Sequence, residues 1–148
     1  MGIYLNPGNE AFQISIASEI YVDKTEMISF VNKRLGQEKR FLCVSRPRRF
    51  GKSMAANMLC AYYDRECDSK ELFKRFSIAK EISFEQHLNQ YDVIFLNIRQ
   101  LIHTADKIEN LVDTIEGQVL EEIKENYKEF LNDSITTLPL ALTTIFTK

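Results

Sequence analysis

Gly51, Lys52 and Ser53 are the residues of this chain whose types and spacing point most directly to a chemical role. In a phosphate-binding loop the glycine lets the backbone approach the phosphates, and the lysine reaches the β and γ phosphates as a point charge. The serine hydroxyl binds Mg²⁺. Three residues are a weak motif by themselves, so the segments that position them decide whether this interpretation holds.

The segments around this motif have the order strand, loop, helix. Residues 41–44 form an apolar run, Pro47 interrupts it, and residues 54–62 repeat apolar side chains with helical spacing. Phosphate loops require this order because the amide groups of the loop and of the first helical turn converge on an anion. The full loop pattern has another glycine five positions before Gly51, and Arg46 stands there in this chain. The expected ATP phosphate-binding residues are Arg46, Arg49, Phe50, Gly51, Lys52, Ser53 and Met54, with Ser53 also binding Mg²⁺.

Two stretches of the chain resemble a known family. They are Tyr21-Val-Asp-Lys-Thr25 and Arg46-Pro-Arg-Arg-Phe-Gly-Lys-Ser53, and Leu72-Phe73 follows them. They are similar to the predicted AAA-ATPase-like family of bacterial and archaeal proteins, in which a P-loop ATPase domain is often joined to a C-terminal nuclease-like domain. In that family the first loop position is characteristically not glycine. The resemblance runs from about residue 12 to the end, and it implies binding of ATP with Mg²⁺.

The same resemblance implies a place for the nucleotide base. In the archaeal-type ATPases to which the family is similar, a Tyr/Phe, Asp, Lys/Arg element ahead of the first strand borders the base. Tyr21, Asp23 and Lys24 match that element. Asp23 also suits the cap of a following helix, with Glu26 three positions on, and Tyr21 also suits the core. The two interpretations are compatible, and both remain open at this point.

Periodicity along the chain predicts an α/β fold. A helix is expected after Asp23, ending at Gly36, and residues 93–98 are a continuous apolar run typical of a strand covered on both faces. Residues 105–131 and 138–146 have helical patterns, the first strongly amphipathic. Strands that alternate with helices indicate a P-loop NTPase-like parallel sheet flanked by helices. The pattern supplies too few strands for a complete sheet.

An acidic residue that hydrolysis requires is not found at its expected place. P-loop ATPases hold Mg²⁺ or polarise the attacking water with an acid at the end of a second strand, and the chain has Asn97 there. We therefore expect residues 1–148 to be the N-terminal part of one AAA-ATPase-like domain, truncated before the acidic strand. Such a fragment would bind nucleotide without turning it over and has no catalytic residue to assign. The missing C-terminal portion, or a second copy pairing at an open sheet edge, is an expected partner.

Composition limits the remaining alternatives. The chain has 148 residues, 45% of them hydrophobic and 27% charged, and a net charge of −2. These values favour one globular domain without a global basic field. Three cysteines form neither a disulfide framework nor a zinc pattern, which favours the cytoplasm, and no apolar run approaches the roughly 18 residues of a membrane span. A nucleic-acid-binding module using Arg46, Arg48 and Arg49 and a small-molecule phosphotransferase using the same loop remain alternatives.

Overall fold

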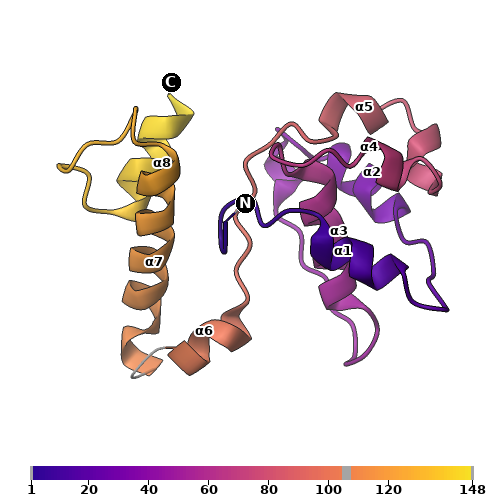
Figure 1. Ribbon diagram of the computed structural model, residues 1–148, viewed down its shortest axis with the longest axis horizontal. Helices are drawn as coiled ribbons and strands as arrows, with labels where there is room; N and C mark the ends of the chain where they lie inside the picture. Colours follow the sequence, from indigo (N-terminus) through magenta and orange to yellow (C-terminus); the bar gives the residue numbers. More distant parts are fainter. Residues whose placement is uncertain (1, 105–107, 148) are drawn as a thin grey trace. The chain divides into compact units, whose positions relative to one another are not determined.

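The computed structural model describes residues 2–104 and 108–147 and divides the chain into two compact units (Figure 1). Unit 1 contains Asn6–Val93. Unit 2 contains Gly2–Leu5 together with Ile94–Lys148. The residues expected to bind nucleotide all lie in unit 1, so this unit positions the candidate site.

Unit 1 is built around its longest helix, α3, which spans Lys52–Tyr63. The helix predicted after Asp23 is α2, Glu26–Asn32, and its N-cap is Thr25, not Asp23. The chain turns after α2 and reaches Gly36, which has a left-handed φ of +75°. The remaining helical elements of the unit are α1 (Glu10–Ile16), η1 (Glu38–Arg40), α4 (Lys70–Phe73), η2 (Ser77–Lys80) and α5 (Phe84–His87).

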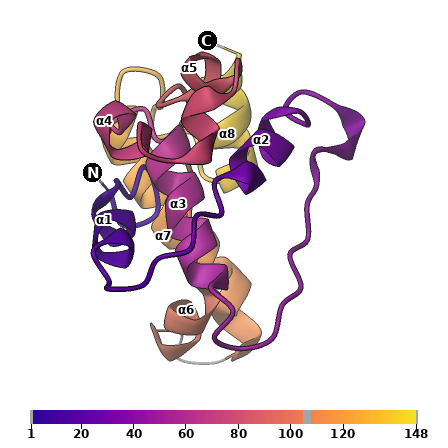
Figure 2. The same cartoon turned by 90° about the vertical axis from the view of Figure 1, so that its right-hand side faces the viewer.

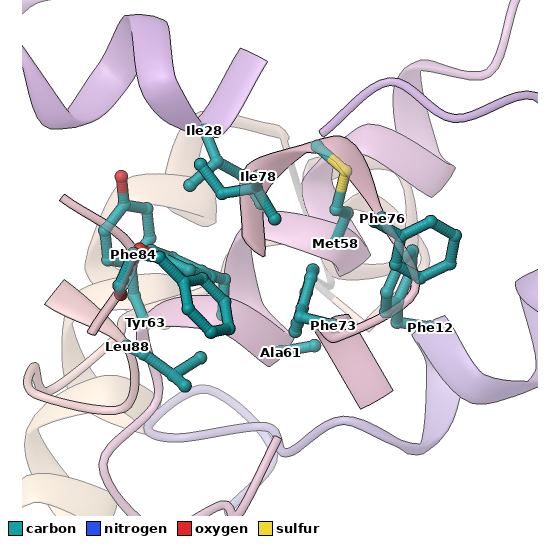
Figure 3. Close-up of a cluster of buried hydrophobic side chains, with 11 residues drawn as sticks. Phe12, Ile28, Met58, Ala61, Tyr63, Phe73, Phe76, Ile78, Phe84 and Leu88 are labelled. Carbon is teal, nitrogen blue, oxygen red and sulfur yellow. Dashed lines mark hydrogen bonds between the residues drawn. The ribbon is translucent and has the colours of Figure 1, made fainter. Parts of the chain in front are cut away.

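The core of unit 1 is rich in aromatic rings (Figure 3). Phe12 of α1 stacks on Phe73 of α4 with ring centroids 5.2 Å apart, and Tyr62 of α3 meets Phe73 edge-on at 5.4 Å. Burying one large apolar side chain contributes about 1.5–3 kcal/mol, so this cluster is the main support of the unit. Its buried members are Phe12, Ile28, Met58, Ala61, Tyr62, Tyr63, Phe73, Phe76, Ile78, Phe84 and Leu88.

Polar atoms within this core are paired. The Tyr62 hydroxyl donates to the carbonyl of Phe84 at 2.7 Å, and the Tyr63 hydroxyl donates to Asn32 Oδ1 at 2.6 Å. Asn32 Nδ2 donates in turn to the Tyr62 hydroxyl at 3.2 Å. Because a buried polar atom without a partner costs about 1–3 kcal/mol, these bonds fix the end of α2 against the end of α3.

Unit 2 contains the amphipathic helix expected from the sequence. The described helical part consists of η3 (Ile108–Asn110) and α7 (Leu111–Asn126), so the helix ends five residues before the expected position 131. Residues 105–107 lie outside the described residues. α6 (Ile98–Thr104) precedes them, and α8 (Leu138–Phe146) has the predicted bounds. Val119 and Ile123 of α7 share a buried cluster with Ala141 of α8. None of the helices described here has the length and apolar composition needed to cross a membrane.

The expected α/β class is wrong. In the described ranges 2–104 and 108–147 there is no strand, and β pairing is limited to two isolated bridges, Leu5 with Ile94 and Asp64 with Tyr91. The described part of the chain is therefore helical with irregular connections. It has no parallel sheet, and the expected self-association at an open sheet edge has no basis in it.

The two apolar runs explain this error. Residues 41–47 follow an open course without secondary structure towards α3, as Figure 2 shows, and Phe41 is 84% exposed. In the other run, Ile94 makes one bridge and α6 begins at Ile98. A run of apolar residues becomes a strand only where another segment satisfies its backbone amide and carbonyl groups. In the described residues, residues 41–44 have no such partner, and the second run has one only at residues 93–95, which bond to Tyr4 and Asn6.

Candidate functional site

The glycine of the Gly-Lys-Ser motif lies directly before α3. Residues 48–51 form a turn that leads into the helix, and Gly51 is the N-cap with φ +78°. Arg49, two positions earlier, also has a positive φ of +67°. A side chain makes this left-handed conformation costly, so a non-glycine residue there is unusual and is often found at functional sites. The loop therefore combines a conformation that glycine favours with one that arginine adopts only under constraint.

The first turn of α3 offers free amide groups. No described side chain caps this helix, and its first turn contains no acidic residue. The first backbone bond in this region runs from the Ala55 amide to the Gly51 carbonyl at 2.9 Å. The amides of residues 51–54 have no acceptor within the described part of the chain. Unpaired amides and the helix dipole make this end of α3 favourable for an anion.

Lys52 folds back over the loop. Its Nζ donates to the carbonyl of Arg46 and, at 3.1 Å, to the carbonyl of Pro47. The ammonium group thus holds the chain ahead of the turn against the start of α3. Lys52 and Ser53 are both exposed. An arriving phosphate would meet the lysine as a mobile cation whose present partners are neutral carbonyl groups.

A pocket of about 260 Å³ opens beside this loop. One wall comes from residues 20–24 and the other from residues 49–51 and the buried face of α3. Apolar side chains reach solvent here, since Ile20 is 84% exposed and Phe50 60%. The lining residues are Ile20, Tyr21, Val22, Lys24, Arg49, Phe50, Gly51, Met54, Ala55 and Met58.

Tyr21 and Lys24, two of the three residues expected near the base, line this pocket. Lys24 Nζ donates to the carbonyl of Phe50 at 3.2 Å, so the lysine joins the two walls. The Tyr21 ring also packs against Phe12 and Phe76, with centroids 6.1 and 5.4 Å away. Burial, with the carboxylate of Asp23, raises the pKa of the Tyr21 phenol. Tyr21 is therefore both a core aromatic and part of the pocket wall.

Asp23, the third residue of that expectation, does not line the pocket. Its carboxylate accepts hydrogen bonds from Thr25 and Ser77, and these residues lie on the core side of the segment. Burial raises the pKa of Asp23, but these hydrogen bonds outweigh it and hold the pKa below its ordinary value. The acid is therefore charged at neutral pH and is engaged within the protein.

Sequence reasoning missed the apolar part of the pocket. Ile20 and Val22 flank Tyr21, and Ala55 and Met58 lie on α3. The signal was present, because Ile20, Tyr21 and Val22 form a short apolar run just before the Asp-Lys pair. Of the expected phosphate-binding residues, Arg46, Lys52 and Ser53 are absent from the pocket lining, and the Arg46 carbonyl accepts from Lys52.

A magnesium ion fits this site only together with phosphate oxygens. The described ranges contain no group of three or more His, Cys, Asp or Glu side chains that could hold a metal ion. Mg²⁺ prefers six oxygen ligands and is commonly bound through one or two protein groups and the substrate phosphates. Ser53 supplies one hydroxyl next to the free amides of α3. The chain's contribution to such a site is therefore this single oxygen.

Comparison with known proteins gives a family. The sequence profile described as "Predicted AAA-ATPase" matches residues 8–147, which is nearly the whole chain. The chain belongs to this predicted AAA-ATPase family. Membership in a family of predicted ATPases is consistent with nucleotide binding as a general property. The matched residues include all those that line the pocket. No curated protein and no solved structure matches the chain.

The conformation of Gly51 gives a first testable prediction for this AAA-ATPase-like chain. Replacing Gly51 by alanine will lower the free energy of unfolding by about 1 kcal/mol, because its φ of +78° disfavours a Cβ. The added Cβ would lie 3.0 Å from Lys24 Nζ, the end of a long side chain that can shift away, so this contact adds little to the cost. The measurement is urea unfolding followed by circular dichroism.

A second glycine provides the matched control. Gly117 lies inside α7, and nothing would come within 4 Å of an added Cβ. Gly117→Ala will therefore raise the free energy of unfolding by about 0.5–1 kcal/mol, the usual gain in a helix interior. Equal effects of the two substitutions would contradict the special role of the Gly51 conformation.

Proposed function

We propose that unit 1 binds a nucleoside triphosphate with Mg²⁺, with ATP as the expected ligand. The observation that carries the proposal is the junction at Gly51. There the uncapped start of α3, with Lys52 and Ser53 in its first turn, opens directly beside the pocket. Family membership supports the same class of ligand.

The phosphates would lie at the start of α3. Amide groups of residues 51–54 would donate to them, as oriented backbone dipoles do in other anion sites. Lys52 would exchange its two carbonyl partners for phosphate oxygens, which form stronger, charge-assisted hydrogen bonds. Arg49 lines the pocket and adds a second cation whose planar group suits phosphate.

The base would enter the apolar part of the pocket. Ile20, Val22 and Phe50 expose 84%, 65% and 60% of their surface around it. Ligand pockets bury most of their ligand against apolar and aromatic side chains, with few polar groups. A flat heterocycle inserted here would cover surface that is otherwise in contact with water. The pocket volume of about 260 Å³ lies just below the range of about 300–1,000 Å³ for small-molecule sites, so only part of the nucleotide would fill it.

Calorimetric titration tests this proposal with three ligands. Mg-ATP engages both halves of the site, Mg-tripolyphosphate engages the phosphate half, and AMP has the base with one phosphate. We expect Mg-ATP to bind most tightly and AMP most weakly, because charge is concentrated at the loop. Saturable binding of none of the three, or AMP binding as tightly as Mg-ATP, would contradict the proposal.

Turnover of the bound nucleotide should be negligible. Among the described residues no acidic side chain lines the pocket, and Asp23 is engaged with Thr25 and Ser77. Hydrolysis requires a group that orients the attacking water or holds Mg²⁺ in the transition state. Phosphate release from Mg-ATP should therefore stay at the level of a buffer blank. A rate above the blank that disappears in Lys52→Ala would refute this prediction.

A second candidate function is binding of single-stranded nucleic acid by residues 33–52. This segment is exposed almost throughout and includes the exposed aromatic residues Phe41 and Phe50. Exposed cations that follow the backbone, with aromatic side chains on which bases stack, are the usual means of binding single strands. The segment has one acid, Glu38, against the basic residues Lys33, Arg34, Lys39, Arg40, Arg46, Arg48, Arg49 and Lys52.

Salt dependence separates the two candidates. Affinity for an oligonucleotide would fall steeply between low and physiological salt, because phosphate contacts release counterions. It would also fall in Arg40→Ala, which lies outside the pocket lining. Nucleotide binding would be unaffected by Arg40→Ala. Oligonucleotide affinity that is insensitive to both changes would exclude this second function.

A further inference from the structure

The carboxylate of Asp23 joins the wall of the pocket to the core of unit 1. Its Oδ1 accepts from the amide and hydroxyl of Thr25 at 2.8 and 2.7 Å. Its Oδ2 accepts from the amide and hydroxyl of Ser77, both at 2.8 Å. Ser77 begins η2, and 54 positions of sequence separate it from Asp23.

Both partners of this carboxylate are tied to the core. Thr25 is fully buried, and its hydroxyl oxygen accepts from the amide of Ile78 at 3.2 Å. Ile78 is itself 1% exposed and belongs to the aromatic core. The residues of the pocket wall, by contrast, have no regular secondary structure between positions 20 and 24. Their course therefore depends on side-chain contacts.

We propose that Asp23 is a positioning residue, which holds Tyr21, Val22 and Lys24 in place as the base-side wall of the pocket without touching the nucleotide. This inference rests on the proposed function, since it assigns the wall a ligand. Two lines of geometry support it. The residues on both sides of Asp23 line the pocket while Asp23 does not, and both of its carboxylate oxygens are already paired.

The proposal separates the two halves of the site. The Asp23 carboxylate makes no contact with the loop at residues 49–51, whose free amides belong to α3. Loss of Asp23 would therefore loosen the base-side wall, and the phosphate side would be affected only through the hydrogen bond from Lys24 to the Phe50 carbonyl. Ordering a loose wall on binding reduces the affinity for any ligand that uses that wall.

Asp23→Ala tests this with two ligands. We expect affinity for Mg-ATP to fall about tenfold, and affinity for Mg-tripolyphosphate to change less than about twofold, because only ATP needs the wall. A purely structural role would weaken both ligands together. Equal losses for the two ligands, or no loss for Mg-ATP, would overturn the proposal.

Milder substitutions keep the test valid if Asp23→Ala folds poorly. Ser77→Ala removes one donor and keeps the Ser77 amide, so we expect a smaller loss for Mg-ATP. Asp23→Asn keeps one carbonyl oxygen but turns an amide group towards donors, so it should restore only part of the affinity. A full loss in Asp23→Asn with no effect of Ser77→Ala would contradict the proposed link.

The positioning role of Asp23 and nucleotide binding by unit 1 can fail separately. If the wild-type protein binds both ligands and Asp23→Ala behaves like wild type, only the positioning role is wrong. If the wild-type protein binds neither ligand, the nucleotide proposal is wrong, and the positioning role falls with it.

Discussion

Replacing Lys52 by alanine is expected to lower the affinity for Mg-ATP by about 100-fold. The substitution removes an ammonium group that already lies at the loop, bonded to the carbonyls of Arg46 and Pro47. Hydrogen bonds to charged groups contribute about 1.5–3 kcal/mol, and about 3 kcal/mol corresponds to two powers of ten in affinity. The dissociation constants are to be measured by calorimetric titration at fixed ionic strength.

A charge-matched control separates this effect from loss of general positive charge. Lys128 is an exposed lysine of unit 2, and Lys128→Ala removes the same charge elsewhere. We expect it to leave the dissociation constant unchanged. Similar losses in the two variants would mean that binding is non-specific attraction to the protein's charge. An unchanged affinity for Mg-ATP in Lys52→Ala would show that Lys52 does not bind the phosphates.

Phe73→Ala is expected to lower the free energy of unfolding by about 3–5 kcal/mol. Phe73 is fully buried, stacks on Phe12 at 5.2 Å and meets Tyr62 edge-on at 5.4 Å. The substitution leaves a cavity at the contact between α1, α3 and α4. Because folded proteins are stable by only about 5–15 kcal/mol, this loss is a large part of the total. The measurement is urea unfolding followed by circular dichroism, since the chain has no tryptophan.

An exposed phenylalanine provides the comparison. Phe41 is 84% exposed, and Phe41→Ala makes the same chemical change without opening a cavity. Its effect should stay within about 0.5 kcal/mol, as is usual for surface positions. A loss in Phe41→Ala as large as in Phe73→Ala would show that residues 41–44 are buried in solution, and would contradict the open course seen in the structure.

Local patterns predicted two of the helices well. The expected helix after the Gly-Lys-Ser motif is α3, and residues 138–146 form α8 with the predicted bounds. Both depend on interactions within a few residues, such as apolar spacing and a glycine before the first turn. The family resemblance is confirmed by the match over residues 8–147. The phosphate-binding roles of these residues stay predictions.

The sequence does not show which segments far apart in the chain pair with each other. Residues 41–44 and 93–98 are apolar enough for strands, but composition does not show which segment, if any, would pair with them. Asp23 illustrates the same limit on a smaller scale. It was interpreted as a helix cap or a residue near the base, whereas its carboxylate bonds to Ser77 across 54 positions. No local pattern reveals such a partner.

The central claim is that the amides at the start of α3 receive phosphate oxygens. Nuclear magnetic resonance of ¹⁵N-labelled protein tests it directly, by following each amide signal as Mg-ATP is added. The account predicts the largest shifts at residues 51–54, a second group at residues 20–24, and no such pattern in Lys52→Ala. Shifts confined to unit 2, or no saturable shift at residues 51–54, would contradict it.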